Sequence, residues 1–128
     1  MIDGLGVDIV EIRRFKRILK RSGDAFLNRV FTKGEIEYSG SKRAPYLHLA
    51  GRFAVKEAVL KAIGDGNIAK IRLKEIEVEN NRDGKPSVRF HGDAAKIKRR
   101  NGIKDVLVSI SHTENYAVAN AILIKNGR

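Results

Sequence analysis

The feature that most constrains the fold is a helical segment bracketed by Pro45 and Gly64. Proline is favoured in the first turn of a helix, and glycine is favoured just past its last turn. The residues between them form the longest helix that the sequence predicts. Its apolar stripe is predicted at Leu49, Phe53, Leu60 and Ile63.

The segment before this helix is predicted to hold one strand and two shorter helices. Residues 2–10 are rich in β-branched side chains and are predicted to form a strand. Apolar residues at helical spacing predict a helix over 11–21. Thr32 and Glu35 form a candidate capping box, which predicts a short helix starting there.

Two hairpins separated by a short helix are predicted after the long helix. Asp83-Gly84 is a hairpin turn signal, and Asp93 is expected to cap a basic helix that ends near Gly102. The four strands are expected over 71–79, 87–91, 106–112 and 116–125. This order predicts an α+β fold in which a small antiparallel sheet packs against the long helix.

The composition limits the class of protein. At 128 residues the chain suits one domain spanning 1–128. It has no cysteine, which excludes disulfides and Cys-based zinc sites. No apolar run is long enough to span a bilayer, and the N-terminus lacks the pattern of a signal peptide. We therefore expect a cytoplasmic protein with no membrane partner.

The formal net charge of +11 predicts a polyanionic partner. A nucleic acid, an acidic protein surface or a polyphosphate ligand would each match this charge, and composition does not choose among them. Aromatic residues make up only 6% and are not interleaved with the basic stretches, which disfavours a single-strand binder. We expect no nucleic-acid partner, and a nucleic-acid-binding domain is the main rival to the enzyme hypothesis given below.

Asp8 is the first candidate for a functional role. On a strand it shares a face with Gly4 and Gly6, and we expect this bare backbone to let a ligand approach closely. The alternative is a solvent-facing carboxylate near a strand end, which is the commoner situation for an isolated aspartate.

Glu57 lies at the border of the apolar stripe on the long helix. A partly desolvated carboxylate needs a cation, which a metal ion or a basic side chain would supply. Lys61, one turn later, would satisfy it as a simple i, i+4 pair. Arg52 and Lys56 form a second basic pair on an adjacent face, and on its own this pair predicts a solvated helix flank.

Ser111 and His112 are adjacent on a predicted strand, so they face opposite sides and are not expected to form a catalytic couple. No nucleophile elbow, Walker loop or dinucleotide-binding glycine motif is present. His112 at a strand end either donates to a phosphate or has no ligand. Two carboxylates without a third protein ligand suit Mg²⁺, and nearby lysine and arginine suit phosphoryl transfer.

Three motifs in this order resemble those of the holo-acyl-carrier-protein synthases, the small phosphopantetheinyl transferases. They are Gly6-Val7-Asp8-Ile9, the F-x-x-K-E-[AS]-x-x-K pattern within 52–62, and Ser109-Ile110-Ser111-His112-Thr113 followed by Tyr116-Ala117. The turn Asp83-Gly84-Lys85-Pro86 is also typical of the family. The resemblance spans nearly the whole chain and implies the phosphopantetheinyl transferase fold.

The resemblance implies transfer of 4′-phosphopantetheine from coenzyme A to a serine of apo acyl carrier protein, with release of 3′,5′-ADP, in fatty acid biosynthesis. It implies that Asp8 and Glu57 hold Mg²⁺ and are catalytic together with Lys61, which would contact the phosphate under attack. Glu57 or a water on the metal would take the serine proton. The implied coenzyme A contacts are Arg52, Lys61, Ser111, His112 and Thr113.

The same resemblance assigns the acidic carrier protein to the basic helix over 11–21. Arg14 matches a family position that contacts the carrier. The expected helpers on this helix are Arg13, Arg17 and Arg21. Small family members are homotrimers with active sites between subunits. His48 and the Lys42-Arg43 loop receive no role. The second rival is a coenzyme A-binding protein without catalytic activity.

Overall fold

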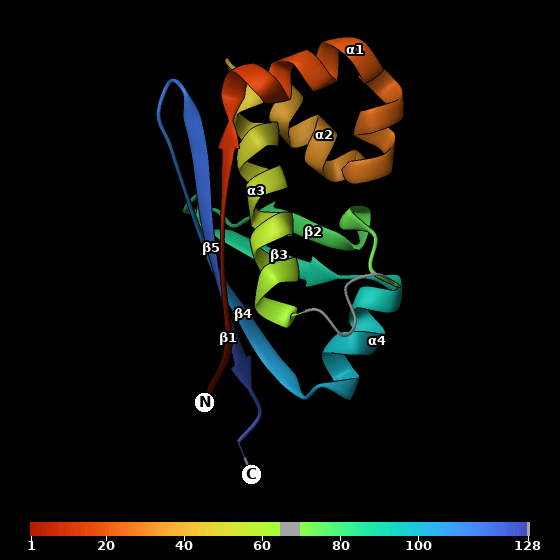
Figure 1. The fold of residues 1–128 in the computed structure, drawn as a ribbon, viewed down its shortest axis with the longest axis vertical. Coiled ribbons are helices and arrows are strands. Elements are labelled where there is room, and N and C mark those ends of the chain that lie inside the picture. Colours follow the sequence, from red (N-terminus) through yellow and green to blue (C-terminus); the bar gives the residue numbers. More distant parts are fainter. Residues whose placement is uncertain (65–69, 128) are drawn as a thin grey trace.

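The computed structural model describes residues 1–64 and 70–127, and it confirms the predicted α+β class (Figure 1). The elements are β1 (Ile2–Glu11), α1 (Ile12–Val30), α2 (Lys33–Gly40), α3 (Pro45–Ile63), β2 (Ile76–Asn80), β3 (Pro86–Phe90), α4 (Gly92–Arg100), β4 (Ile103–His112) and β5 (Tyr116–Lys125). A short 3-10 helix at Leu73–Glu75 precedes β2.

The strands form two antiparallel sheets. The larger has the order β1-β5-β4, and the smaller is the hairpin β2-β3. In the larger sheet Asp8 pairs with Ala119, which pairs in turn with Ile110 on β4. Helix α3 lies between the two sheets, with α1 and α2 near its N-terminal end and α4 near its C-terminal end (Figure 1). Both flanks of α3 are therefore bordered by other elements.

Helix α3 meets the large sheet through small residues on both sides. Gly4 and Gly6 face the helix, and an added Cβ at Gly6 would overlap the carbonyl oxygen of Ala58. The opposing face of α3 carries an alanine at every fourth position, namely Ala50, Ala54, Ala58 and Ala62, all buried. The expectation that these glycines leave room for a ligand is wrong, because the backbone of α3 occupies that space.

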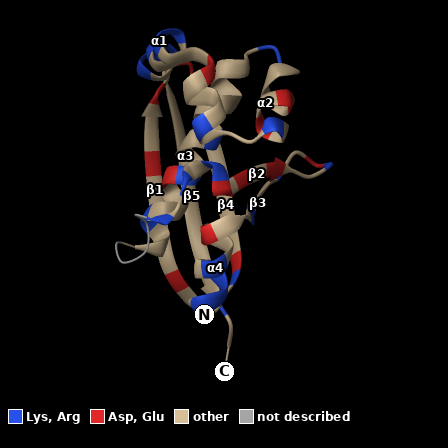
Figure 2. Cartoon of the chain, turned by 90° about the vertical axis from the view of Figure 1, so that its right-hand side faces the viewer, with Lys and Arg blue, Asp and Glu red and all other residues tan. Residues whose placement is uncertain are grey.

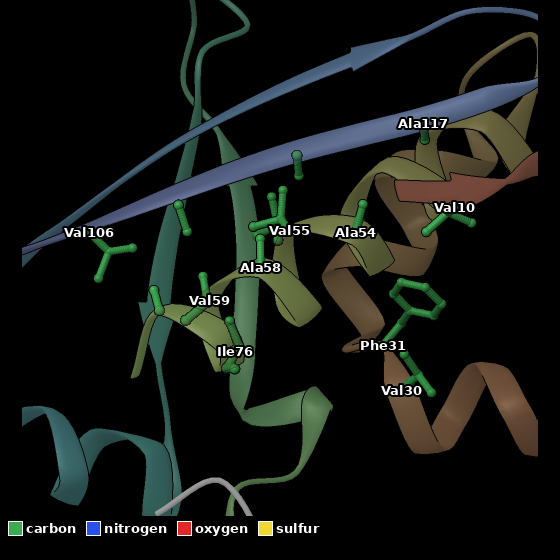
Figure 3. Packing of buried hydrophobic residues seen from close by; sticks show 14 of the residues in the cluster. Val10, Val30, Phe31, Ala54, Val55, Ala58, Val59, Ile76, Val106 and Ala117 are labelled. Carbon is green, nitrogen blue, oxygen red and sulfur yellow. The ribbon is translucent and has the colours of Figure 1, made fainter. Parts of the chain in front are cut away.

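The core extends from this contact into both sheets (Figure 3). Val55 and Val59 on α3 are fully buried, and so is Ile76 on β2. The predicted apolar stripe of α3 is only partly correct, since Leu49 is buried while Phe53, Leu60 and Ile63 are half-buried at its edge. At the other end, four phenylalanine rings pack at centroid distances of 5.7 to 6.3 Å, namely Phe15, Phe26, Phe31 and Phe53.

Helix α1 runs further than predicted. It was expected to end at Arg21, but helical backbone resumes after Gly23, whose φ of 48° breaks the helix. The second part forms because Phe26 and Val30 are buried against the core. The two ends of α3 agree with the prediction, with Pro45 in the first turn and Gly64 as the C-cap. Among the described residues, no helix has both the length and the apolar character needed to cross a membrane.

Glu75 accounts for two further corrections. The strand expected from residue 71 starts at Ile76, because the Glu75 amide donates to the Arg72 carbonyl oxygen at 2.9 Å and closes a 3-10 turn. The Glu75 carboxylate caps this turn by accepting the Arg72 amide at 3.2 Å. The same carboxylate accepts the Asp93 amide at 3.3 Å. Asp93 therefore does not cap α4, whose N-cap position is held by His91. Strand β4 also begins earlier than expected, at Ile103.

Lys56 is fully buried, which corrects the expectation of a solvated flank. Its Nζ lies 2.8 Å from Oε1 of Glu35 and also donates to the Leu73 and Ile76 carbonyl oxygens. Glu35 completes the predicted capping box with Thr32 and accepts the Val78 amide. This one ion pair therefore ties α2, α3 and β2 together.

Replacing Gly6 by alanine is expected to destabilise the protein by about 3 kcal/mol, because the new Cβ would push α3 off the sheet. Urea unfolding at a fixed protein concentration measures this change. Gly40→Ala is the matched control, since the space around Gly40 is open. We expect it to change stability by less than about 1 kcal/mol. Equal effects of the two substitutions would contradict the close approach.

Candidate functional site

Asp8 and Glu57 meet on one flank of α3. Asp8 lies on the face of β1 that carries Gly4 and Gly6, so the close approach of the helix brings its carboxylate to the edge of α3. Lys61 Nζ lies 3.1 Å from Asp8 Oδ1 and 3.1 Å from the Val7 carbonyl oxygen. The side chain of Asp8 is only 16% exposed, so it is not the solvent-facing carboxylate of the alternative reading.

The pKa of Glu57 is raised above its ordinary value, first by burial and then by the negative charge of Asp8, while Lys61 opposes the shift. The ion pair that Lys61 forms is with Asp8 and not with Glu57. A carboxylate whose ionisation is opposed by a neighbouring carboxylate is suited to share a divalent cation with that neighbour. Within residues 1–64 and 70–127, no group of three acidic, histidine or cysteine side chains is placed to hold a metal ion. Mg²⁺ fits this donor set, because it commonly keeps waters and completes its shell with substrate phosphates.

A cleft of about 440 Å³ opens beside the two carboxylates, between β1, α1 and α3. Asp8 and Glu57 lie in its wall, and Arg14 lies at the α1 side. Its remaining lining combines apolar and polar side chains, namely Ile9, Val10, Glu11, Phe15, Ile18, Phe53 and Tyr116. A flexible chain carrying a reactive group could enter this cleft and reach the carboxylates.

Helix α1 is rich in lysine and arginine (Figure 2), and it borders this cleft through Arg14. Arg14, Arg17 and Arg21 are exposed, and their spacing of three and four residues puts them on one face. With Ile18 and Ser22 they line a second hollow of about 420 Å³. Arg13 is also exposed but lines neither hollow.

Arg52 lies on the other flank of α3 and is only 3% exposed. Its guanidinium carbon stands 4.2 Å from the centre of the Tyr38 ring, and Nη2 donates to Oδ1 of Asn80. The Nε atom is buried and has no hydrogen-bond partner among the described residues. Burial lowers the pKa of Arg52, and Tyr38 and Glu35 oppose this shift. A buried cation with an unused donor is suited to receive an anion.

His112 lies on the same flank as Arg52, at the exposed end of β4. Its ring is 6.4 Å from the ring of His48 on α3, and His48 is 6.1 Å from the ring of Tyr38 on α2. Ser111 precedes His112 on the same strand, so its side chain points to the outer face of the sheet, away from the side of His112. Thr113 Oγ1 accepts the amides of Asn115 and Tyr116, which gives it a role in the turn.

The predicted site residues therefore separate into two half-sites. Glu57 follows His48 by nine residues, which is about 180° around an α-helix, and it follows Arg52 by about 140°. We call Asp8, Glu57 and Lys61 the carboxylate half-site, and Arg52 and His112 the cationic half-site. A single chain brings together the members of each half-site and separates the two half-sites across α3.

Several residues of this region were given no functional role in the sequence analysis. His48 lies one helical turn before Arg52, and this spacing could have placed it in the cationic half-site. The cleft residues Phe15 and Phe53 could have been found as apolar side chains near the motifs. Nothing local could have identified Tyr38 or Asn80, because their contacts with Arg52 come from other elements.

Comparison with known proteins agrees with this architecture. The model of the 4′-phosphopantetheinyl transferase superfamily matches residues 4–121. The chain is 50% identical to the holo-[acyl-carrier-protein] synthase of Thermodesulfovibrio yellowstonii, over 96% of this chain and 99% of that protein. Its structure resembles that of the synthase from Neisseria meningitidis, with a TM-score of 0.88, 33% identity and coverage of 98% and 100%. It also resembles the Bacillus anthracis synthase in complex with CoA (3′,5′-ADP), with a TM-score of 0.79, 33% identity and coverage of 98% and 99%. The chain therefore belongs to the 4′-phosphopantetheinyl transferase superfamily and, within it, to the holo-[acyl-carrier-protein] synthase family.

Proposed function

We propose that this protein transfers the 4′-phosphopantetheine group of coenzyme A to a serine of apo acyl carrier protein, in fatty acid biosynthesis. The observation that carries the proposal is the meeting of Asp8 and Glu57 at the wall of one cleft, with Lys61 paired to Asp8. The family membership and the coenzyme A bound to the Bacillus anthracis relative support the same substrate. The serine oxygen forms a bond to the β-phosphorus of coenzyme A. The bond from this phosphorus to the bridging oxygen breaks, and 3′,5′-ADP leaves.

In this reaction Asp8 and Glu57 would hold Mg²⁺, which neutralises charge on the pyrophosphate. The ammonium group of Lys61 is held by Asp8 and by the Val7 carbonyl oxygen. Because the Lys61 side chain is 57% exposed, this group can also contact the phosphate under attack. Either Glu57 or a water on the metal would accept the serine proton. Apolar cleft walls at Phe15 and Phe53 would limit access of water to the phosphorus.

We infer that the cationic half-site is supplied by a neighbouring copy of the chain. Coenzyme A phosphates would need Arg52 and His112 together with the carboxylate half-site, yet α3 separates these groups within one chain. The outer face of the β1-β5-β4 sheet offers an interface for such a copy. It exposes large apolar side chains, namely Leu5 at 69%, Val7 at 54%, Ile9 at 62% and Leu107 at 48%. An exposed apolar face of this kind is typical of an assembly surface, and the homotrimer implied by the family resemblance would cover it.

The face of α1 formed by Arg14, Arg17 and Arg21 is proposed to bind the acidic carrier protein. It borders the cleft that contains the carboxylate half-site, so a carrier docked there would hold its serine close to the reacting phosphate. Positive charge on α1 would also speed the encounter with an acidic partner. A cytoplasmic location is part of this proposal, because both substrates would be met there.

Asp8→Asn and Glu57→Gln are each expected to lower transfer by about a thousandfold, because each removes a carboxylate that holds the metal ion. The measurement is the mass of apo carrier protein after incubation with coenzyme A and Mg²⁺, with and without a chelator. The fold should survive, since removal of one charge relieves repulsion between the two carboxylates. Asp93→Asn on α4 is the control and should leave turnover unchanged. Near-normal transfer by either variant at saturating Mg²⁺, or full transfer in the presence of the chelator, would overturn the metal assignment.

Arg14→Glu is expected to raise the KM for the carrier protein by about tenfold or more, with a much smaller change in the KM for coenzyme A, because it reverses charge on the face of α1 that would dock the acidic carrier. Arg99→Glu is the matched control, since Arg99 is an exposed arginine on α4 at the other end of the molecule (Figure 1). Steady-state kinetics with each substrate varied separately provides the comparison. Equal KM effects on the two substrates, or equal effects of the two variants, would contradict docking on α1.

A further inference from the structure

His48 lies beside Arg52 and His112, the two residues of the cationic half-site. Neither the sequence pattern nor the family motifs gave His48 a role. The His48 ring packs between two other rings, with Tyr38 on one side and His112 on the other. Both contacts are edge-on. His48 precedes Arg52 by one helical turn on α3. His48 is therefore positioned to contact the same ligand as Arg52 and His112.

The groups that face His48 come from four elements. Arg52 lies on α3 itself, His112 lies on β4, Lys42 lies in the loop after α2, and the Tyr38 phenol comes from α2. The charged and titratable groups that influence His48 are thus cationic or protonatable. Such a cluster is stable without a counter-ion only if part of it stays neutral.

His48 has a physical reason to stay neutral in the free protein. Its pKa is lowered from the ordinary histidine value, first by burial and then by Arg52, His112 and Lys42. Histidine is the side chain whose charge responds to modest changes in surroundings near neutral pH. A phosphate group placed among these residues would reverse the balance, because its negative charge favours the imidazolium form.

We propose that His48 is a phosphate-binding residue of the cationic half-site and takes up a proton from solvent when a phosphate group of coenzyme A binds there. The inference rests on the proposed function, since it takes the anion at Arg52 and His112 to be part of coenzyme A. It adds to that function a proton coupled to substrate binding.

The sign of the pH dependence follows from the two states of His48. In the free protein the pKa of His48 is lowered, and in the complex the bound phosphate raises it. The extra affinity is fully present below the pKa of the free protein and is lost as pH rises through the pKa of the complex. Protons are taken up on binding only between these two pKa values.

Isothermal titration of 3′,5′-ADP into the assembled protein tests this inference directly. Titrations in two buffers with different ionisation enthalpies give the number of protons taken up on binding. Between about pH 6 and pH 8.5, wild-type affinity is expected to fall about tenfold more than that of His48→Gln. At the upper pH the two proteins should bind equally well, and the variant should show less proton uptake near neutral pH.

Two further variants separate this role from packing and from unrelated histidines. His48→Phe keeps an aromatic ring between Tyr38 and His112 but cannot take a proton, so it should behave as His48→Gln does. His91→Gln removes the histidine that pairs with Glu77 at 2.8 Å on the small sheet, and it should retain the wild-type pH dependence. Titration of the ligand's own phosphates is common to all four proteins and cancels in the comparison.

The outcomes are distinguishable. Wild-type proton uptake in both His48 variants would overturn the role of His48 while leaving the proposed function intact. Failure of the wild-type protein to bind 3′,5′-ADP at any pH would overturn both. Reduced proton uptake in the two His48 variants, with wild-type uptake in His91→Gln, is the result that we expect.

Discussion

The approach of α3 to the glycine face of β1 is the contact on which the rest of the site depends. Gly4 and Gly6 carry no side chain, and the facing helix presents only alanine at every fourth position, so the two backbones come close together. At this distance the carboxylate of Asp8 reaches the edge of the helix, where it adds to the burial that raises the pKa of Glu57. A larger residue in this contact would move the two carboxylates apart. The geometry of the proposed metal site is therefore set by packing in the core.

A second constraint fixes the other side of α3. The fully buried pair of Lys56 and Glu35 joins α3 to α2 and to β2, and Glu35 also caps α2 through Thr32. Loss of one partner would leave an uncompensated charge in the core, which is strongly destabilising. Because this pair holds α2 beside α3, Tyr38 is kept over the guanidinium group of Arg52. Lys56 thus orders the cationic half-site, while its neighbour Glu57 belongs to the carboxylate half-site.

Features with a local physical cause could be predicted from the sequence. Pro45, Gly64, the Thr32–Glu35 capping box and the Asp83-Gly84 turn all act within a few residues, and each prediction is confirmed. Contacts between distant segments could not be predicted in this way. Glu75 replaces Asp93 at the start of α4 and converts the expected start of a strand into a 3-10 turn, and no pattern around either residue indicates this.

In the candidate site, too, features with a local cause could be predicted, whereas contacts between distant segments could not. Helical periodicity alone is sufficient to put His48 and Glu57 on opposite sides of α3, so the separation of the half-sites could have been found from the sequence. No local pattern fixes the convergence of Asp8 on Glu57, which donor chemistry allowed and the family resemblance implied. A strand face without side chains admits a ligand or a helix equally well. The sequence analysis expected a ligand beside Gly4 and Gly6, but the structure has a helix there. Only the three-dimensional partner decides between these two uses of glycine.

The central claim is that α3 divides the site, so that each working site combines one chain's carboxylate half-site with another chain's cationic half-site. The most direct measurement is the transfer activity of mixed assemblies, made by refolding Glu57→Gln and His112→Ala chains together. Each variant alone should be nearly inactive. With random mixing in equal amounts, about one quarter of the sites should be intact, and activity should recover accordingly. Activity no higher than that of the separate variants, in assemblies shown to contain both chains, would contradict the claim.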